Sequence, residues 1–199
     1  LTGRTFVCAQ GFGASGGTKT ADGSPCPKAP APITASDPAD FTDASPGVGI
    51  MPPGSPGRPP GLPLVSNLPI PAAPTPAGLE NEHARGLALH TFAHHELQAL
   101  ELMALALLRF PNAPGGFRMG LARIILDEQR HFSLYRQRAE HWGTGLGEVG
   151  VGHFFWSTVA HLESPAAFLA ALSLTYEQAN LDYAIYWKQA FEAVDDHDS

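Results

Sequence analysis

The prolines divide this chain into two parts that cannot fold in the same way. Of its 19 prolines, all but Pro111, Pro114 and Pro165 lie within residues 1–78. Proline lacks a backbone N–H and breaks helix interiors, so residues 1–78 cannot form long helices. Residues 79–199 are rich in Ala, Leu, Glu and His, and they suffice for one modest hydrophobic core. The sequence therefore predicts a Pro/Gly-rich extended arm or linker, followed by one helical domain.

Two interpretations of residues 1–78 remain open. A segment of this composition buries little surface by itself and is typical of a disordered linker. It can also lie as an ordered arm over the helical domain or over a partner, and we favour the arm because it has apolar anchors. These anchors are Leu62, Leu64, Val65, Leu68 and Ile70. Both cysteines, Cys8 and Cys26, lie in this part. They can form one disulfide bond, but a single bond does not indicate a disulfide-stabilised fold.

The net charge and the absence of long apolar runs limit the function classes. The formal net charge is −7, which weighs against nonspecific binding to nucleic acid or to an anionic membrane. No apolar run approaches the roughly 20 residues of a membrane span, and no signal peptide is visible. We therefore expect a cytoplasmic protein. The chain begins with Leu1 rather than Met, which leaves open whether Leu1 and Ser199 are its natural termini.

Hydrophobic periodicity predicts an all-α domain with three long helices and no strand. The predicted helices span about residues 79–110, 117–142 and 165–194. Pro111 ends the first helix, and Ser164-Pro165 supplies an N-cap and a first-turn proline for the third. The apolar face of the third helix is expected to include Ala170, Leu174 and Leu181. The intervening residues 143–164 are long enough to carry the chain to the far end of a bundle.

Each predicted helix carries a glutamate on its apolar face. They are Glu96 in the first helix, Glu128 in the second and Glu177 in the third, and His131 follows Glu128 by three residues. A single glutamate in such a position commonly reaches out to solvent, and a single Glu-x-x-His pair arises often by chance. It is rarer for three consecutive helices each to carry such a glutamate and for one of them to add a correctly spaced histidine. Because uncompensated buried charges are costly, metal coordination is a common reason for acidic side chains to converge with an imidazole.

The types of these side chains predict a site for two iron ions, or for iron and manganese. Carboxylates with one imidazole per metal favour Fe or Mn over metals that prefer thiolates. Glu96 would be a terminal ligand of the first metal, Glu128 would bridge both metals, His131 would bind the first and Glu177 would be terminal on the second. The second metal would still lack a bridging glutamate and a histidine. No catalytic residue can be named.

Other polar and aromatic residues near these positions receive simpler interpretations. We expect His90, His94 and His95 to be surface histidines or to orient a ligand through a hydrogen bond. Tyr135 and Tyr176 are expected to pack in the core rather than to take part in redox chemistry. We expect a solvated tail at residues 195–198, which are Asp195, Asp196, His197 and Asp198.

Four segments together resemble a bacterial family of ferritin-like proteins that is distantly related to the tRNA-modifying di-iron monooxygenase. The segments are His94–Ala104, Asp127–Tyr135, Phe154–Trp156 and Leu172–Glu177. The resemblance covers about residues 80–190 and leaves the proline-rich part outside it. It implies a four-helix ferritin-like bundle in which Glu96, Glu128, His131 and Glu177 bind metal, but it implies no settled reaction.

The resemblance also implies a fourth helix with a second Glu-x-x-His, and the 22 residues after Glu177 do not supply one. The sequence therefore contains three of the four core helices that such a bundle needs. Our first hypothesis is a di-iron or Fe/Mn oxidoreductase that activates O2 or peroxide and is completed by a helix not in this chain. The alternatives are a non-enzymatic accessory or structural subunit, which binds a partner through a degenerate bundle and the arm, and a protein of iron storage or detoxification. A protein partner or a homo-oligomer is expected. RNA modification is supported by analogy alone.

Overall fold

The computed structural model describes part of the proline-rich segment and all of the helical part. The described residues are Gly49, Met51, 53–59, Leu62, Leu64, 68–72 and 74–199. The predictions for Cys8 and Cys26, and for most of the arm, lie outside these residues. Within them all regular secondary structure is helical and no strand occurs, as predicted. Among the described residues, no helix combines the length and apolar character that a membrane span requires.

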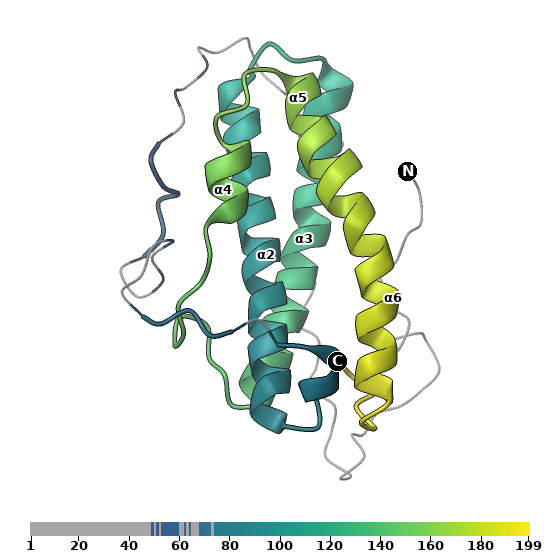
Figure 1. The fold of residues 1–199 in the computed structure, drawn as a ribbon. Helices are drawn as coiled ribbons and strands as arrows, with labels where there is room; N and C mark the ends of the chain where they lie inside the picture. Colours follow the sequence, from purple (N-terminus) through teal and green to yellow (C-terminus); the bar gives the residue numbers. More distant parts are fainter. Residues whose placement is uncertain are drawn as a thin grey trace.

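Helices α2 and α3 lie side by side (Figure 1). A short 3-10 helix, η2 (Pro76–Gly78), precedes α2 (Glu82–Arg109), and α3 spans Gly115–His141. Asn81 caps α2, because its side chain accepts a hydrogen bond from the His83 N–H at 2.9 Å. At the other end of α2, the Arg118 guanidinium donates to the Leu107 and Phe110 carbonyls, which the helix leaves without partners. The predicted bounds of both helices are therefore correct to within a few residues.

The third helical run lies beside α3, inclined to the α2–α3 pair, and has an irregular middle (Figure 1). It consists of α5 (Pro165–Leu169), a π-helix labelled η3 (Ala170–Glu177) and α6 (Gln178–Glu192). The Ser164 hydroxyl accepts from the Ala167 N–H at 3.1 Å, which confirms the predicted N-cap. The connection before this run contains one further short helix, α4 (Phe154–Val159), which the sequence did not predict.

The π-helix changes which side chains of the third run face inwards. A π-turn holds one residue more than an α-turn, so later side chains rotate by about 100° from their α-helical positions. The predicted apolar face is consequently wrong at Ala170 and at Leu174, which is 74% exposed. Glu177 is the last residue of the π-helix, so this irregularity ends at a predicted metal ligand.

Two apolar clusters hold the helices together, one at each end of the α2–α3 pair. The first includes Leu102, Leu121 and Phe168, and the second includes Leu89, Ala139 and Phe191. Glu96, Glu128 and His131 fall between these two clusters along α2 and α3. The candidate site therefore lies between two independent regions of apolar packing.

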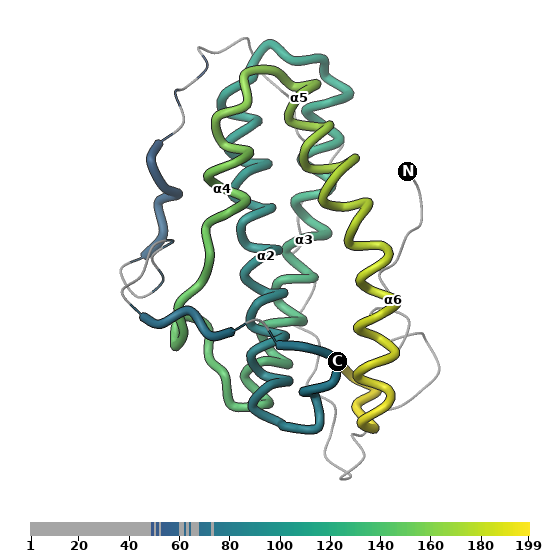
Figure 2. Tube along the Cα trace, in the orientation of Figure 1, coloured from purple at the N-terminus to yellow at the C-terminus, as the bar shows by residue number. Residues whose placement is uncertain are grey.

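Described residues of the proline-rich segment pack against the helical part of the same chain, beside α2 and α4 (Figure 2). Leu64 is buried in the first apolar cluster. The Arg58 guanidinium donates to both carboxylate oxygens of Glu101 on α2, at 2.6 and 2.7 Å. The Gly150 N–H donates to the Pro69 carbonyl at 3.0 Å. At these few residues the proline-rich segment contacts the helical part, and the arm as a whole stays a prediction.

The end of the chain is not simply a solvated tail. Asp196 is 6% exposed, and its carboxylate accepts hydrogen bonds from Arg138 at 2.9 Å and from the Trp142 indole at 3.1 Å. The prediction for residues 195–198 is therefore wrong at Asp196. A run of acids is ordinarily solvated, and here the tertiary approach of Arg138 and Trp142 provides partners for the buried carboxylate.

Candidate metal centre

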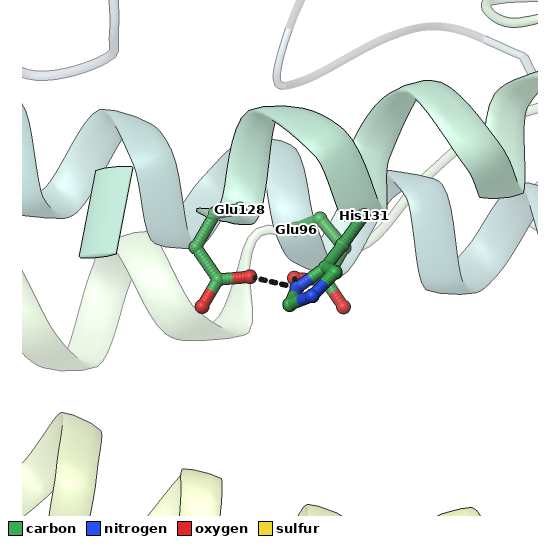
Figure 3. A group of neighbouring side chains, drawn as sticks. All are labelled: Glu96, Glu128 and His131. Carbon is green, nitrogen blue, oxygen red and sulfur yellow. Dashed lines mark hydrogen bonds and ion pairs between the residues drawn. The ribbon is translucent and has the colours of Figure 1, made fainter. Parts of the chain in front are cut away.

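Three of the four predicted ligands converge on one point between α2 and α3. Glu96 extends from α2, and Glu128 and His131 extend from α3 (Figure 3). One ligand atom from each of the three lies within 4.8 Å of the others. The spacing of three residues places Glu128 and His131 on the same face of α3, which is why one helix supplies two of the groups.

Hydrogen bonding orders the cluster. His131 Nδ1 lies 2.8 Å from Glu128 Oε2 and 4.0 Å from Glu96 Oε2. The side chains of Glu96, Glu128 and His131 are 16%, 7% and 19% exposed, so water reaches the cluster only in part. A metal ion bound here would be held by groups that the two helices already direct toward one another.

The pKa values of the Glu96 and Glu128 carboxyl groups shift in opposite directions. Burial raises the pKa of Glu96 well above its usual value, and the hydrogen bond with Glu128 and the charges of Glu128 and Glu177 add to the increase. Burial acts on Glu128 in the same sense, but hydrogen bonds from His131 and Glu96 and the charge of His131 outweigh it. The pKa of Glu128 therefore lies below its usual value. These opposite shifts favour placing a shared proton on Glu96 rather than on Glu128.

Glu177 stands outside the group of three but belongs to the same electrostatic environment. Burial, followed by the negative charge of Glu128, raises the pKa of Glu177 to about 7. A hydrogen bond from Asn180, three residues later on the same run, opposes this increase and orients the carboxylate. The third helical run thus brings a fourth predicted ligand close enough to sense the charge of Glu128.

Aromatic packing surrounds the cluster. The ring of Tyr135, one helical turn after His131, packs edge-on against Phe92 with centroids 5.4 Å apart. On the third run, Tyr176 packs against Phe155 at 4.8 Å. Both tyrosines are packed against other rings, as predicted. Phe92 also contacts Trp187 of α6 at 5.2 Å, so aromatic side chains bridge the third run to α2.

The sequence interpretation missed a second group of polar residues on α2. His90, His94 and Gln98 are each 2% exposed, which shows that His90 and His94 are not surface histidines. The signal was available, since the three polar residues recur at intervals of four and so share one helical face. The prediction failed because a polar helical face is ordinarily solvated, whereas here the connection between α3 and α5 covers it.

Comparisons with known proteins identify the family of this chain but assign no activity to that family. Residues 33–199 match a family model described as "Protein of unknown function (DUF455)". The matched range therefore includes much of the proline-rich segment. Comparisons with curated proteins and with solved structures each found no match.

Proposed function

This chain belongs to the DUF455 family, and we propose that it is a ferritin-like di-metal protein that acts as an oxidoreductase. Its proposed activity is the activation of O2 or peroxide at a di-iron or Fe/Mn site. The observation that carries the proposal is the convergence of Glu96, Glu128 and His131 from two helices on one largely buried point. Glu177 on the third run supports it, because burial and, second to it, the negative charge of Glu128 raise the pKa of Glu177.

The chemistry of these side chains fits the proposed ions. Three carboxylates and one imidazole favour Fe or Mn, and no thiolate belongs to the set. Without a cation the carboxylates cannot all ionise at neutral pH, and a divalent ion would compensate the charge that their burial makes costly. Glu96 and His131 would hold the first metal, Glu128 would bridge, and Glu177 would be terminal on the second.

The second metal needs ligands beyond those that the described residues bring to the cluster, and we propose that a further helix provides them. Support comes from large apolar side chains that the third run and its surroundings leave exposed. They are Leu169, Leu174, Tyr183, Ile185 and Tyr186. Gathered apolar exposure of this kind marks a surface that another element covers. The helix would come from a continuation of this chain, a second copy or another protein.

When bound, iron or manganese would supply the redox and Lewis-acid chemistry that side chains lack. The residues of this chain would bind and orient the ions, and they would determine which ligands carry a proton. Glu96 must release its proton before its carboxylate can coordinate, so metal uptake releases protons. Phe92 and Tyr135, each one helical turn from a ligand, pack together and restrict water at that end of the cluster.

Elemental analysis of protein purified without added metal tests the proposal. We expect about two iron or manganese ions per complete site, and at least one in the chain alone. Glu128→Gln should abolish binding, whereas Glu140→Gln, an exposed glutamate on the same helix, should leave it unchanged. If the wild-type chain binds no iron or manganese even after reconstitution, or if Glu128→Gln retains its metal, the proposed centre is wrong.

The exposed apolar side chains of the third run also favour a second candidate, a non-enzymatic accessory subunit. In that case the bundle would be a docking surface, and Glu128→Gln would leave assembly with a partner intact. The described arm residues pack on their own helical domain rather than projecting from it, so the docking surface of this candidate would be the third run. A di-iron absorption band that changes with oxidant would count against it.

A further inference from the structure

A second polar region lies on the face of α2 opposite the metal centre. His90, His94, Gln98 and Glu101 recur every three or four residues and share one helical face, which we call the polar row. Glu96 falls on the opposite face of the same helix. The first three side chains of the polar row are each 2% exposed, and Glu101 is 15% exposed. So much buried polar surface is costly unless its hydrogen bonds are satisfied.

Protein groups satisfy only part of the polar row. The Gly152 carbonyl lies 2.8 Å from His94 Nε2 and accepts from the Gln98 amide at 3.3 Å. The Gln98 carbonyl oxygen accepts from the Trp156 backbone N–H at 3.3 Å. Arg58 pairs with Glu101. The connection after α3 and the proline-rich segment therefore cover the row with polar rather than apolar contacts.

Several buried polar atoms in this region have no protein partner. Within the described residues, the buried side-chain atoms without a hydrogen bond are Arg58 Nη1, His90 Nε2, His94 Nδ1, Thr144 Oγ1 and Trp156 Nε1. Each belongs to the polar row or to a residue that packs over it. Thr144 lies at the start of the row, because a Cβ added to Gly86, one turn before His90, would be 2.4 Å from Thr144 Oγ1. The unsatisfied atoms are thus distributed along the polar row and the residues that cover it, and we call this strip the seam.

We propose that ordered water molecules bind along the polar row and bridge these atoms. His94 Nε2 faces a carbonyl oxygen and must carry the proton, so Nδ1 offers a lone pair that needs a donor. Arg58 and Trp156 offer only donors, and Thr144 offers both. Water is the small ligand that can donate to the imidazole and accept from the guanidinium or indole.

The charge nearest to His94 favours water over a metal ion at this histidine. The Arg58 guanidinium acts on His94 as a positive charge and would repel a cation there. No group of three metal-binding side chains within the described residues includes His90 or His94. The water sites are therefore separate from the metal centre, and they can be tested on metal-free protein.

The substitution Thr144→Val tests the proposal, because a hydrated seam and a dry seam predict different changes in the melting temperature. If water bonds to the hydroxyl, the valine leaves that water short of a partner, and the melting temperature should fall by roughly 2–4 °C. If the seam is dry, the valine removes an unsatisfied buried hydroxyl, and the melting temperature should stay constant or rise. The reverse change Val159→Thr, at a residue only 1% exposed in the apolar core, calibrates the effect of an unsatisfied hydroxyl in this fold.

Direct detection of water gives a second, independent measurement on the unsubstituted chain. Magnetisation transfer from water to the Trp156 indole proton and to protons of the His90 and His94 rings should reveal long-lived contacts in NMR spectra. Such contacts together with a destabilised Thr144→Val protein support the proposal. Absent contacts, or a Thr144→Val protein at least as stable as the wild type, overturn it. Stoichiometric metal binding at His90 and His94 in a Glu128→Gln background would overturn it as well.

Discussion

Replacing Glu177 by glutamine should stabilise the metal-free protein at alkaline pH, and this effect should disappear in acid. Burial and the charge of Glu128 raise the pKa of Glu177 from 4.5 to about 7 on folding. Because the folded-state pKa is the higher one, the folded protein binds the proton more tightly than the unfolded chain. The resulting stabilisation is fully present below pH 4.5 and is lost as the pH rises through 7.

The size of the effect follows from the pKa difference. A change of one pKa unit corresponds to about 1.4 kcal/mol, so a shift from 4.5 to about 7 gives an upper limit of about 3 kcal/mol. Glu177 is only partly buried, and solvent screens some of its interactions, which lowers the expected value to about 2 kcal/mol. Relative to wild type, Glu177→Gln should therefore gain about 2 kcal/mol of unfolding free energy between pH 4.5 and pH 8.

Urea unfolding of chelator-treated protein, followed by far-ultraviolet circular dichroism from pH 4.5 to 8, measures this gain. Glu163→Gln, at an exposed position before α5, controls for the chemical change itself. Saturating metal should reverse the sign, since glutamine removes a ligand from the proposed site. If the stability curves of wild type and Glu177→Gln run parallel with pH, Glu177 does not lie in the environment described above.

Three further perturbations test other parts of the structure. Metal uptake should release protons, measurable by titration in weakly buffered solution, and affinity should rise with pH because Glu96 is protonated in the metal-free cluster. Arg58→Met should lower the unfolding free energy by about 3 kcal/mol in urea titrations, since it leaves Glu101 without its partner, and adding Glu101→Met should recover most of the loss. Deleting Leu174 from the π-helix should restore α-helical geometry and turn Glu177 away from the cluster. Metal content should then fall while helicity is kept, and unchanged metal content would contradict this role of the π-helix.

The sequence predicted those features that depend on local spacing. The limits of α2 and α3, and the cap at Ser164, follow from periodicity and from end signals within a few residues. The convergence of Glu96 with Glu128 and His131 was also predictable, since each occupies the apolar face of its own helix and those faces must meet in a bundle.

Features that depend on contacts distant in sequence were not predictable. The π-helix offers no sequence signal, and it turns Leu174 outward although simple periodicity places it inside. Asp196 resembles a solvated acid until Arg138 is known to lie beside it. The polar row was misjudged for the same reason, because its burial is produced by residues more than fifty positions away.

The position of the cluster between two apolar regions explains how the chain can keep costly groups in its interior. Leu102 and its neighbours pack at one end of the α2–α3 pair, and Leu89 and its neighbours pack at the other. Losing the metal would raise the electrostatic cost only between these regions, so the helices should remain paired while the cluster takes up protons. The same acidic residues that reduce the stability of the metal-free fold would then give metal binding at the proposed site much of its driving force. Replacing Glu96 or Glu177 with an apolar residue should therefore stabilise the metal-free bundle, so their burial fits the proposed metal site better than a bundle used only for docking.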